Sequence, residues 1–197
     1  IYRDVTLTVT DPVHIERYGT QVTTPDIASG IGTVSINTEV KNDSNMSASV
    51  TVRNTVYTKS GEAVSNTTET SLTIAAGASG TAAAKPVVAS PALWSIDTPT
   101  LYIVRTEIIK DGNVIDSYDT TFGFRYFSFD STGFHLNGKN VKLNGVCLHH
   151  DQGALGSAAY YDAMYRQISM MKDMGVNAIR ISHNPGDEDF IDICNEL

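Results

Sequence analysis

The chain has 197 residues, of which 41% are hydrophobic and 18% are charged, a composition typical of a globular protein with one or two domains. The formal net charge of −8 repels phosphate backbones and disfavours nucleic-acid binding. No run of about 20 apolar residues is present, so no membrane span is predicted. The sequence starts at Ile1 and is strand-like from its second residue, which predicts a piece of a longer protein.

The first part of the chain, residues 1–125, is predicted to consist of β-strands. A strand-like run, YRDVTLTVTDPVHI, starts at residue 2, and apolar and polar residues alternate in GTVSINTEVKN and SASVTVRNTVYT. Asp111-Gly112 is a strong hairpin signal between two further strands. Short strands spaced by roughly ten residues favour an immunoglobulin-like β-sandwich. No Cys–Trp–Cys spacing is present, so the likeness is architectural only.

Trp94, the only tryptophan, lies in SPALWSIDTPTLY near the end of this predicted domain. Two roles fit it. The ring either packs a loop onto the sandwich or stacks on a ligand.

Residues 126–197 follow a different pattern. A hairpin across Asn137-Gly138 precedes an apolar strand near 141–148. A helix is predicted next, stopped by Gly175, with an apolar stripe formed by Tyr161, Met164, Ile168 and Met171. A strand, VNAIRIS, and a second helix, GDEDFIDICNEL, complete the pattern. Strand–helix–strand–helix order predicts parallel α/β structure.

Two strand–helix units cannot close a barrel, which needs eight units and about 250 residues. The sequence therefore predicts the first units of an incomplete TIM barrel. Its open strand edge and bare helix faces predict self-association, or partial disorder after about residue 150.

Polar residues follow both predicted barrel strands, where α/β proteins gather their chemistry. His149, His150 and Asp151 follow the first strand, and the segment Arg180–Asn184 ends the second. If Ile179 and Ile181 pack beneath the helices, Arg180 points into the barrel. A guanidinium buried there needs carboxylates, carbonyls or a ligand around it.

Other roles for these residues are open. Arg180 could belong to a structural ion pair in the barrel floor. His149, His150 and His183 with Asp151 could ligate a metal, but neighbouring histidines on a strand point to opposite faces, so no metal is predicted. His150 is interpreted as a packing or supporting residue. GALG is too short for a phosphate cradle, and no cofactor is predicted.

The two cysteines are far apart in the sequence. Cys147 and Cys194 fit neither a disulfide framework nor a zinc pattern, and they are predicted to be small buried thiols.

At these motifs the sequence resembles glycoside hydrolase family 2, which includes β-galactosidases, β-glucuronidases and β-mannosidases. NAIRISHNP is similar to the family signature N-x-x-R-x-S-H-Y-P, and FHLNGKNVKLNGVCLHHD resembles the lead into the first barrel strand. LWSIDTPTLY and GFRYF resemble the closing strands of the preceding sandwich, and IYRDVTLTVTDPVHI resembles the join to an N-terminal sugar-binding domain. Asn184 departs from the tyrosine usual in the signature.

The resemblance implies a retaining glycosidase with two carboxylates about 5–5.5 Å apart. In the family both are glutamates on later barrel strands, so residues 1–197 are expected to hold no catalytic residue and to be inactive alone. Asn195-Glu196 is rejected as the acid/base motif because it lies in the second predicted helix. By resemblance, His149, Arg180 and His183 shape the sugar pocket, and Asp151 contacts substrate.

The predicted function is that of a fragment of a retaining β-glycosidase, with β-galactosidase preferred. A β-glucuronidase or β-mannosidase of the same family is an alternative, as is a carbohydrate-binding, adhesion or structural β-sandwich module. The predicted partner is a β-galactoside or a related glycan. The sequence leaves the compartment undecided between a bacterial periplasm and the cytoplasm.

Overall fold

A computed structural model describes residues 3–28 and 30–197. The chain divides into two compact units. Residues 8–94 and 100–126 form one unit, and residues 95–99 and 127–197, together with the described residues 3–7, form the other.

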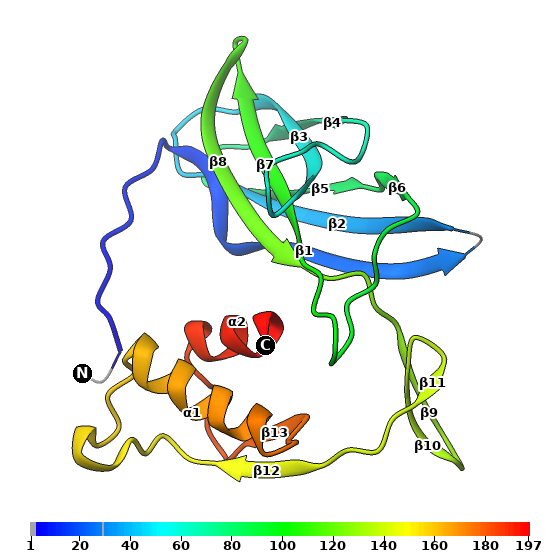
Figure 1. The fold of residues 1–197 in the computed structure, drawn as a ribbon. Coiled ribbons are helices and arrows are strands. Elements are labelled where there is room, and N and C mark those ends of the chain that lie inside the picture. Colours follow the sequence, from blue (N-terminus) through cyan, green and yellow to red (C-terminus); the bar gives the residue numbers. More distant parts are fainter. Residues whose placement is uncertain (1–2, 29) are drawn as a thin grey trace. The chain divides into compact units, whose positions relative to one another are not determined.

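The first unit is a β-sandwich of two four-stranded sheets (Figure 1). One sheet contains β1 (Val13–Ala28), β2 (Ile31–Asn42) and β5 (Ser79–Ala84), with β6 (Val87–Ala89) also paired to β2. The other has the order β4 (Thr68–Ile74), β3 (Ala48–Thr58), β7 (Tyr102–Lys110), β8 (Asn113–Phe122). The predicted sandwich is confirmed.

Alternation in the sequence builds the sandwich core. Between Val34 and Val40 of β2, every second residue is completely buried, namely Val34, Ile36, Thr38 and Val40. The facing sheet contributes equally buried side chains, namely Val52, Val56, Val104 and Ile108. Since successive strand residues point to opposite faces, this period-two pattern is what places the apolar set inside.

The predicted hairpin between β7 and β8 is also present. Asp111 and Gly112 have φ angles of 51° and 80°, and Lys110 pairs with Asn113 across the turn. A two-residue turn with both φ angles positive matches the twist of the strands it joins, which explains the Asp-Gly sequence.

Trp94 packs onto the sandwich. Its backbone N–H donates to the carbonyl of Phe124 at 2.8 Å. A Cβ atom on Gly123 would lie 2.7 Å from the Trp94 Cβ, so the glycine makes room for the tryptophan. The Arg125 guanidinium lies 5.6 Å from the centre of the indole ring. These contacts support the anchoring role and give no support to ligand stacking.

The strand expected from residue 2 is wrong in its first part. Strand β1 starts only at Val13, and Val5, Leu7 and Val9 are 80%, 90% and 84% exposed. A strand forms when a neighbour satisfies its backbone N–H and C=O groups. Among the described residues, no strand pairs with this segment, so its alternation alone does not order it.

The second unit starts with a three-stranded sheet of β9 (Phe127–Asp130), β10 (Gly133–Leu136) and β11 (Lys139–Asn140). The predicted Asn137-Gly138 turn joins β10 to β11, with φ angles of 52° and 75°. The next strand, β12 (Gly145–Leu148), is parallel to β13 (Ala178–Ile181). The strand predicted near 141–148 is therefore shorter, because residues 141–144 form a linker instead of pairing with β13.

Helix α1 (Tyr161–Asp173) connects the two parallel strands, and α2 (Glu188–Glu196) follows β13. A short 3-10 helix, η1 (Gly153–Leu155), lies in the loop before α1. The order β12–α1–β13–α2 is the start of a TIM barrel, as predicted, and Asn195 and Glu196 lie in a helix.

The helices pack against the strands through the buried side chains of Met164, Ile168, Phe190 and Ile193. Tyr161, predicted to lie on the same apolar stripe, is 44% exposed. Its ring stacks on Tyr165 with centroids 6.1 Å apart, instead of packing on the strands. Asp187 caps α2 by accepting the Asp189 N–H at 3.1 Å.

A cross-strand ion pair in the sandwich makes stability depend on pH. The Arg105 side chain binds both carboxylate oxygens of Asp119 at 2.8 Å, and this lowers the pKa of Asp119. Because both side chains are over 40% exposed, at 46% and 42%, solvent limits the contribution to about 0.5–1 kcal/mol. We expect Asp119→Asn to cost this much at pH 7, measured by urea unfolding.

The sign follows from the lowered pKa. The stabilisation is present above the unfolded-state pKa of about 3.9 and is lost as pH falls through the lower folded-state value. The cost of Asp119→Asn should therefore shrink towards zero at pH 2. The exposed Asp26, replaced by Asn, is the control. An equal cost for Asp119→Asn at both pH values would contradict the ion-pair origin.

Candidate functional site

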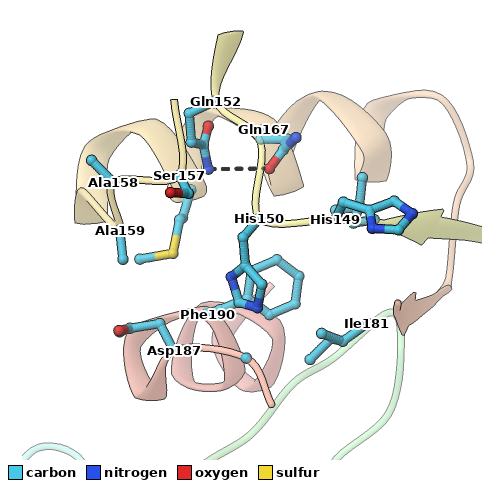
Figure 2. Close-up of a pocket in the computed structure, with 13 residues that line it drawn as sticks. His149, His150, Gln152, Ser157, Ala158, Ala159, Gln167, Ile181, Asp187 and Phe190 are labelled. Carbon is cyan, nitrogen blue, oxygen red and sulfur yellow. Dashed lines mark hydrogen bonds between the residues drawn. The ribbon is translucent and has the colours of Figure 1, made fainter. Parts of the chain in front are cut away.

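The candidate site lies where β12 and β13 end. The parallel register runs from Gly145 opposite Ala178 to Leu148 opposite Ile181, so both strands reach their carboxyl ends at the same edge. His149 follows β12 directly, and Ser182 and His183 follow β13. Figure 2 shows His149 and Ile181 at this edge.

The two faces of this small sheet differ. Leu148, Ile179 and Ile181 pack against the helix core, as predicted for the isoleucines. Cys147 and Arg180 are register partners on the opposite face, and both are exposed. In a closed barrel this second face is the interior, because the helices cover the outside.

His149 and His183 are brought together. Their ring centroids are 5.7 Å apart, with the planes tilted by 59°, and both side chains are exposed. His183 adopts a φ of 67°, a left-handed conformation that is unfavourable for residues other than glycine. Such backbone conformations concentrate at functional sites, which makes His183 a candidate in its own right.

Arg180 lies on the expected face but is not enclosed. Its Nη1 lies 3.5 Å from the Ser182 hydroxyl oxygen, to which it donates. Within residues 3–28 and 30–197, no carboxylate forms an ion pair with its guanidinium. The side chain is exposed because two strands do not surround an interior. That a guanidinium buried in a complete barrel is held by carboxylates, carbonyls or a ligand stays a prediction.

Asp151 takes part in its own loop. Its Oδ1 accepts the Gly153 N–H at 2.9 Å, and its side chain is exposed. The carboxylate therefore stabilises the turn into η1. The structure thus brings His149 and His183 together and places Arg180 on the open face, while Asp151 lies in the loop after β12.

His150 points to the other side, into a pocket between the loop and the two helices (Figure 2). Phe190 and Asp187 line the pocket with it, and Gln152 Nε2 donates to Gln167 Oε1 at 3.4 Å. This arrangement agrees with a supporting role for His150, since it packs behind the edge that carries His149.

The two glutamines were not identified from the sequence. Gln152 and Gln167 connect the loop after β12 to α1 through this hydrogen bond between their side chains. One signal was available. Gln167 lies three residues after Met164 and one before Ile168, so it is a polar residue within the apolar stripe of α1.

The thiols differ from the prediction of two buried groups. Cys147 is exposed because the face of β12 on which it lies is uncovered, and Cys194 is only half-buried. Burial raises the pKa of Cys194 to about 11.

Among the described residues, no group of three or more His, Cys, Asp or Glu side chains is placed to hold a metal. No described helix has the length and apolar character required to cross a membrane.

Comparison with known proteins identifies the class. Residues 13–125 match the family model "Glycosyl hydrolases family 2", and residues 128–197 match "Glycosyl hydrolases family 2, TIM barrel domain". The chain belongs to glycosyl hydrolase family 2, which confirms the resemblance seen in the sequence.

Individual relatives carry two activities in their names. The β-galactosidase BoGH2A of Bacteroides ovatus is 38% identical over the whole of this chain, which spans 23% of that protein. A family 2 crystal structure from Bacteroides cellulosilyticus superposes with a TM-score of 0.91 at 35% identity, covering 95% of this chain and 26% of its own. For a Bacteroides uniformis β-glucuronidase the TM-score is 0.86 at 33% identity, with 95% and 23% covered. The chain thus spans about a quarter of the length of these relatives.

Proposed function

We propose that residues 1–197 form part of a longer retaining β-glycosidase, with a β-galactoside as the preferred substrate. The acid/base and nucleophile glutamates of this enzyme would lie on later barrel strands. The observation that carries the proposal is the pairing of His149 with His183 at the carboxyl ends of two parallel strands, with rings 5.7 Å apart. Family membership over both domains supports it.

The chemistry of these side chains suits a sugar. Hydroxyl groups donate and accept hydrogen bonds, an imidazole can do either at its two nitrogens, and a guanidinium offers five donors. We propose that His149, His183 and Arg180 contact the sugar bound between the carboxylates, with Asp151 at the rim. Arg180 can also hold a nearby carboxylate in its charged form by lowering its pKa. In the complete enzyme, hydrogen bonds to ring hydroxyls that tighten in the transition state would lower the activation free energy of hydrolysis by several kcal/mol.

The isolated chain should not hydrolyse glycosides. Its candidate site combines histidines and an arginine with Asp151, whose carboxylate already binds its own loop. Glu196 is the last residue of α2 and lies far along the chain from the strand ends. A retaining mechanism needs two carboxylates about 5–5.5 Å apart, and we propose that both lie on later barrel strands.

The test compares the 197-residue chain with the longer polypeptide that contains it, using 4-nitrophenyl β-galactoside. We expect turnover by the longer polypeptide and none by the chain alone. Turnover by the isolated chain that survives Glu196→Gln and disappears with Asp151→Asn would overturn the proposal that the carboxylate pair lies elsewhere. A longer polypeptide that binds glycans without hydrolysing any would favour a binding module.

A β-glucuronidase is the second candidate. Arg180 favours it, because an exposed guanidinium without an acidic partner among the described residues could bind the carboxylate of a uronic acid. The ratio of kcat/KM for 4-nitrophenyl β-galactoside to that for the β-glucuronide decides between the two. A ratio below one favours the glucuronidase.

A further inference from the structure

The small sheet β9–β10–β11 has one apolar face. Phe129 is paired with Phe134, and Phe127 with Leu136, so these four side chains share one side of the sheet. We call them the aromatic face. The Phe129 and Phe134 rings lie 5.2 Å apart, and Phe127 lies 6.1 Å and 6.3 Å from them. The opposite side carries the polar residues Ser128, Asp130 and His135.

Leu136, at one end of this aromatic face, is buried with 6% of its surface exposed, but the β9 half of the face is uncovered. Phe127 is 58% exposed and Phe129 is 69% exposed, although each lies in a strand and contacts a neighbouring ring. A sheet with one apolar face is stable when that face is packed against another layer. Clustered exposed aromatic side chains of this kind mark an interaction surface.

Hydrogen bonds tie the sheet to the amino-terminal edge of the barrel strands. The Val141 N–H donates to the Phe134 carbonyl at 2.8 Å, which joins the linker to β10. Asn177, directly before β13, donates through Nδ2 to the Lys142 carbonyl at 3.0 Å and accepts the Asn144 N–H at 2.8 Å. The linker is therefore fixed at the end of the barrel opposite to His149 and His183.

We propose that the aromatic face is a docking surface for the amino-terminal ends of the later barrel strands, so that this sheet closes the barrel at its amino-terminal end. The inference rests on the proposed function, in which residues 1–197 belong to a longer barrel enzyme. Its occupant is inferred from the position of the sheet at the amino ends of β12 and β13, and from relatives of which this chain spans only 23–26%.

A closed barrel has an interior filled with layers of apolar side chains. Catalytic residues gather at the carboxyl-terminal end of such a barrel, so the amino-terminal end of these layers is free to be covered by an apolar element. An apolar sheet fastened by Asn177 to the first two strands is positioned to be this cover. A second copy of the chain is the competing occupant, and the net charge of −8 on each copy opposes it.

The test uses Phe129→Ser, with Val114→Ser as the matched control because Val114 is 48% exposed on β8 of the sandwich. Thermal unfolding is measured for the longer polypeptide and for the 197-residue chain. We expect Phe129→Ser to lower the midpoint of the longer polypeptide by about 3 °C or more and to leave the isolated chain within about 1 °C. Val114→Ser should leave both unchanged.

A dye that binds apolar surfaces gives a second readout, in which the comparison of the two wild-type proteins needs no variant. The isolated wild-type chain should bind it, binding should fall in Phe127→Ser/Phe129→Ser, and the longer wild-type polypeptide should bind far less per chain. An unchanged midpoint for Phe129→Ser in the longer polypeptide would overturn the proposal. So would a dimeric isolated chain that becomes monomeric with the same substitution, since a second copy would then be the occupant.

Hydrolysis of 4-nitrophenyl glycosides by the wild-type longer polypeptide separates the two proposals. An active enzyme with an indifferent Phe129→Ser variant refutes the docking surface and leaves the proposed function intact. If the longer polypeptide is inactive but Phe129→Ser lowers its unfolding midpoint, the docking surface is supported and the proposed function is refuted.

Discussion

Replacing Phe124 with alanine is expected to lower the free energy of unfolding of the sandwich by about 3–5 kcal/mol. Phe124 is completely buried, and its ring lies 5.0 Å from Tyr102 and 5.2 Å from Phe122. Removing the ring leaves a cavity that the rigid sheets cannot fill. Urea unfolding followed by fluorescence of Trp94 reports the change, because Trp94 lies beside Phe124 and its backbone N–H donates to the Phe124 carbonyl.

The close fit around Phe124 explains why relaxation cannot recover this loss. A Cβ atom on Gly32 would lie 2.5 Å from the Phe124 Cε1, so the ring occupies the space that the glycine leaves open. Tyr118→Ala, at a site 46% exposed on β8, is the matched control and should cost less than about 1 kcal/mol. Equal costs for the two substitutions would show that the ring cluster does not carry the stability of the sandwich.

The parts of the fold that could be predicted depend on local patterns. Val34 and Ile36 are buried because alternation along one strand already assigns them to one face. The turns at Asp111-Gly112 and Asn137-Gly138 depend on the residues' tolerance of positive φ, which is a local property too.

The failures concern partners far away in the chain. The run through Val5, Leu7 and Val9 has a strand pattern, but no described strand is available to pair with it. Cys147 was predicted to be buried from its residue type, yet the second strand face has nothing packed on it. Whether such a face is covered depends on elements elsewhere in the protein, which the sequence of the strand itself does not indicate.

The candidate site has features that local sequence patterns predict and features that they do not. That His149 and His183 lie near each other follows from parallel strands that end at one edge, which the strand–helix–strand pattern predicts. The left-handed backbone of His183 and the exposure of Arg180 were not predictable, because the first depends on the path of the loop after β13 and the second on how much of a barrel surrounds the strand.

Arg180→Ala in the longer polypeptide is expected to lower kcat/KM for 4-nitrophenyl β-galactoside by about 10- to 100-fold. Hydrogen bonds from a charged donor contribute about 1.5–3 kcal/mol, and each 1.4 kcal/mol is a factor of ten. In the 197-residue chain the side chain is exposed and binds one hydroxyl, that of Ser182, so its removal should leave that chain folded. Steady-state kinetics of the longer polypeptide measure the first effect, and the unfolding midpoint of the 197-residue chain measures the second.

Two further variants separate a role in the site from a general effect of charge. Arg180→Lys keeps the positive charge but loses the planar, five-donor group, so it should recover only part of the activity if geometry matters. Arg17→Ala removes one exposed arginine from β1 of the sandwich and should leave kcat/KM unchanged. If Arg17→Ala and Arg180→Ala reduce kcat/KM equally, or if neither does, Arg180 does not contact the reacting sugar, and the strand edge that carries His149 and His183 is not the sugar site.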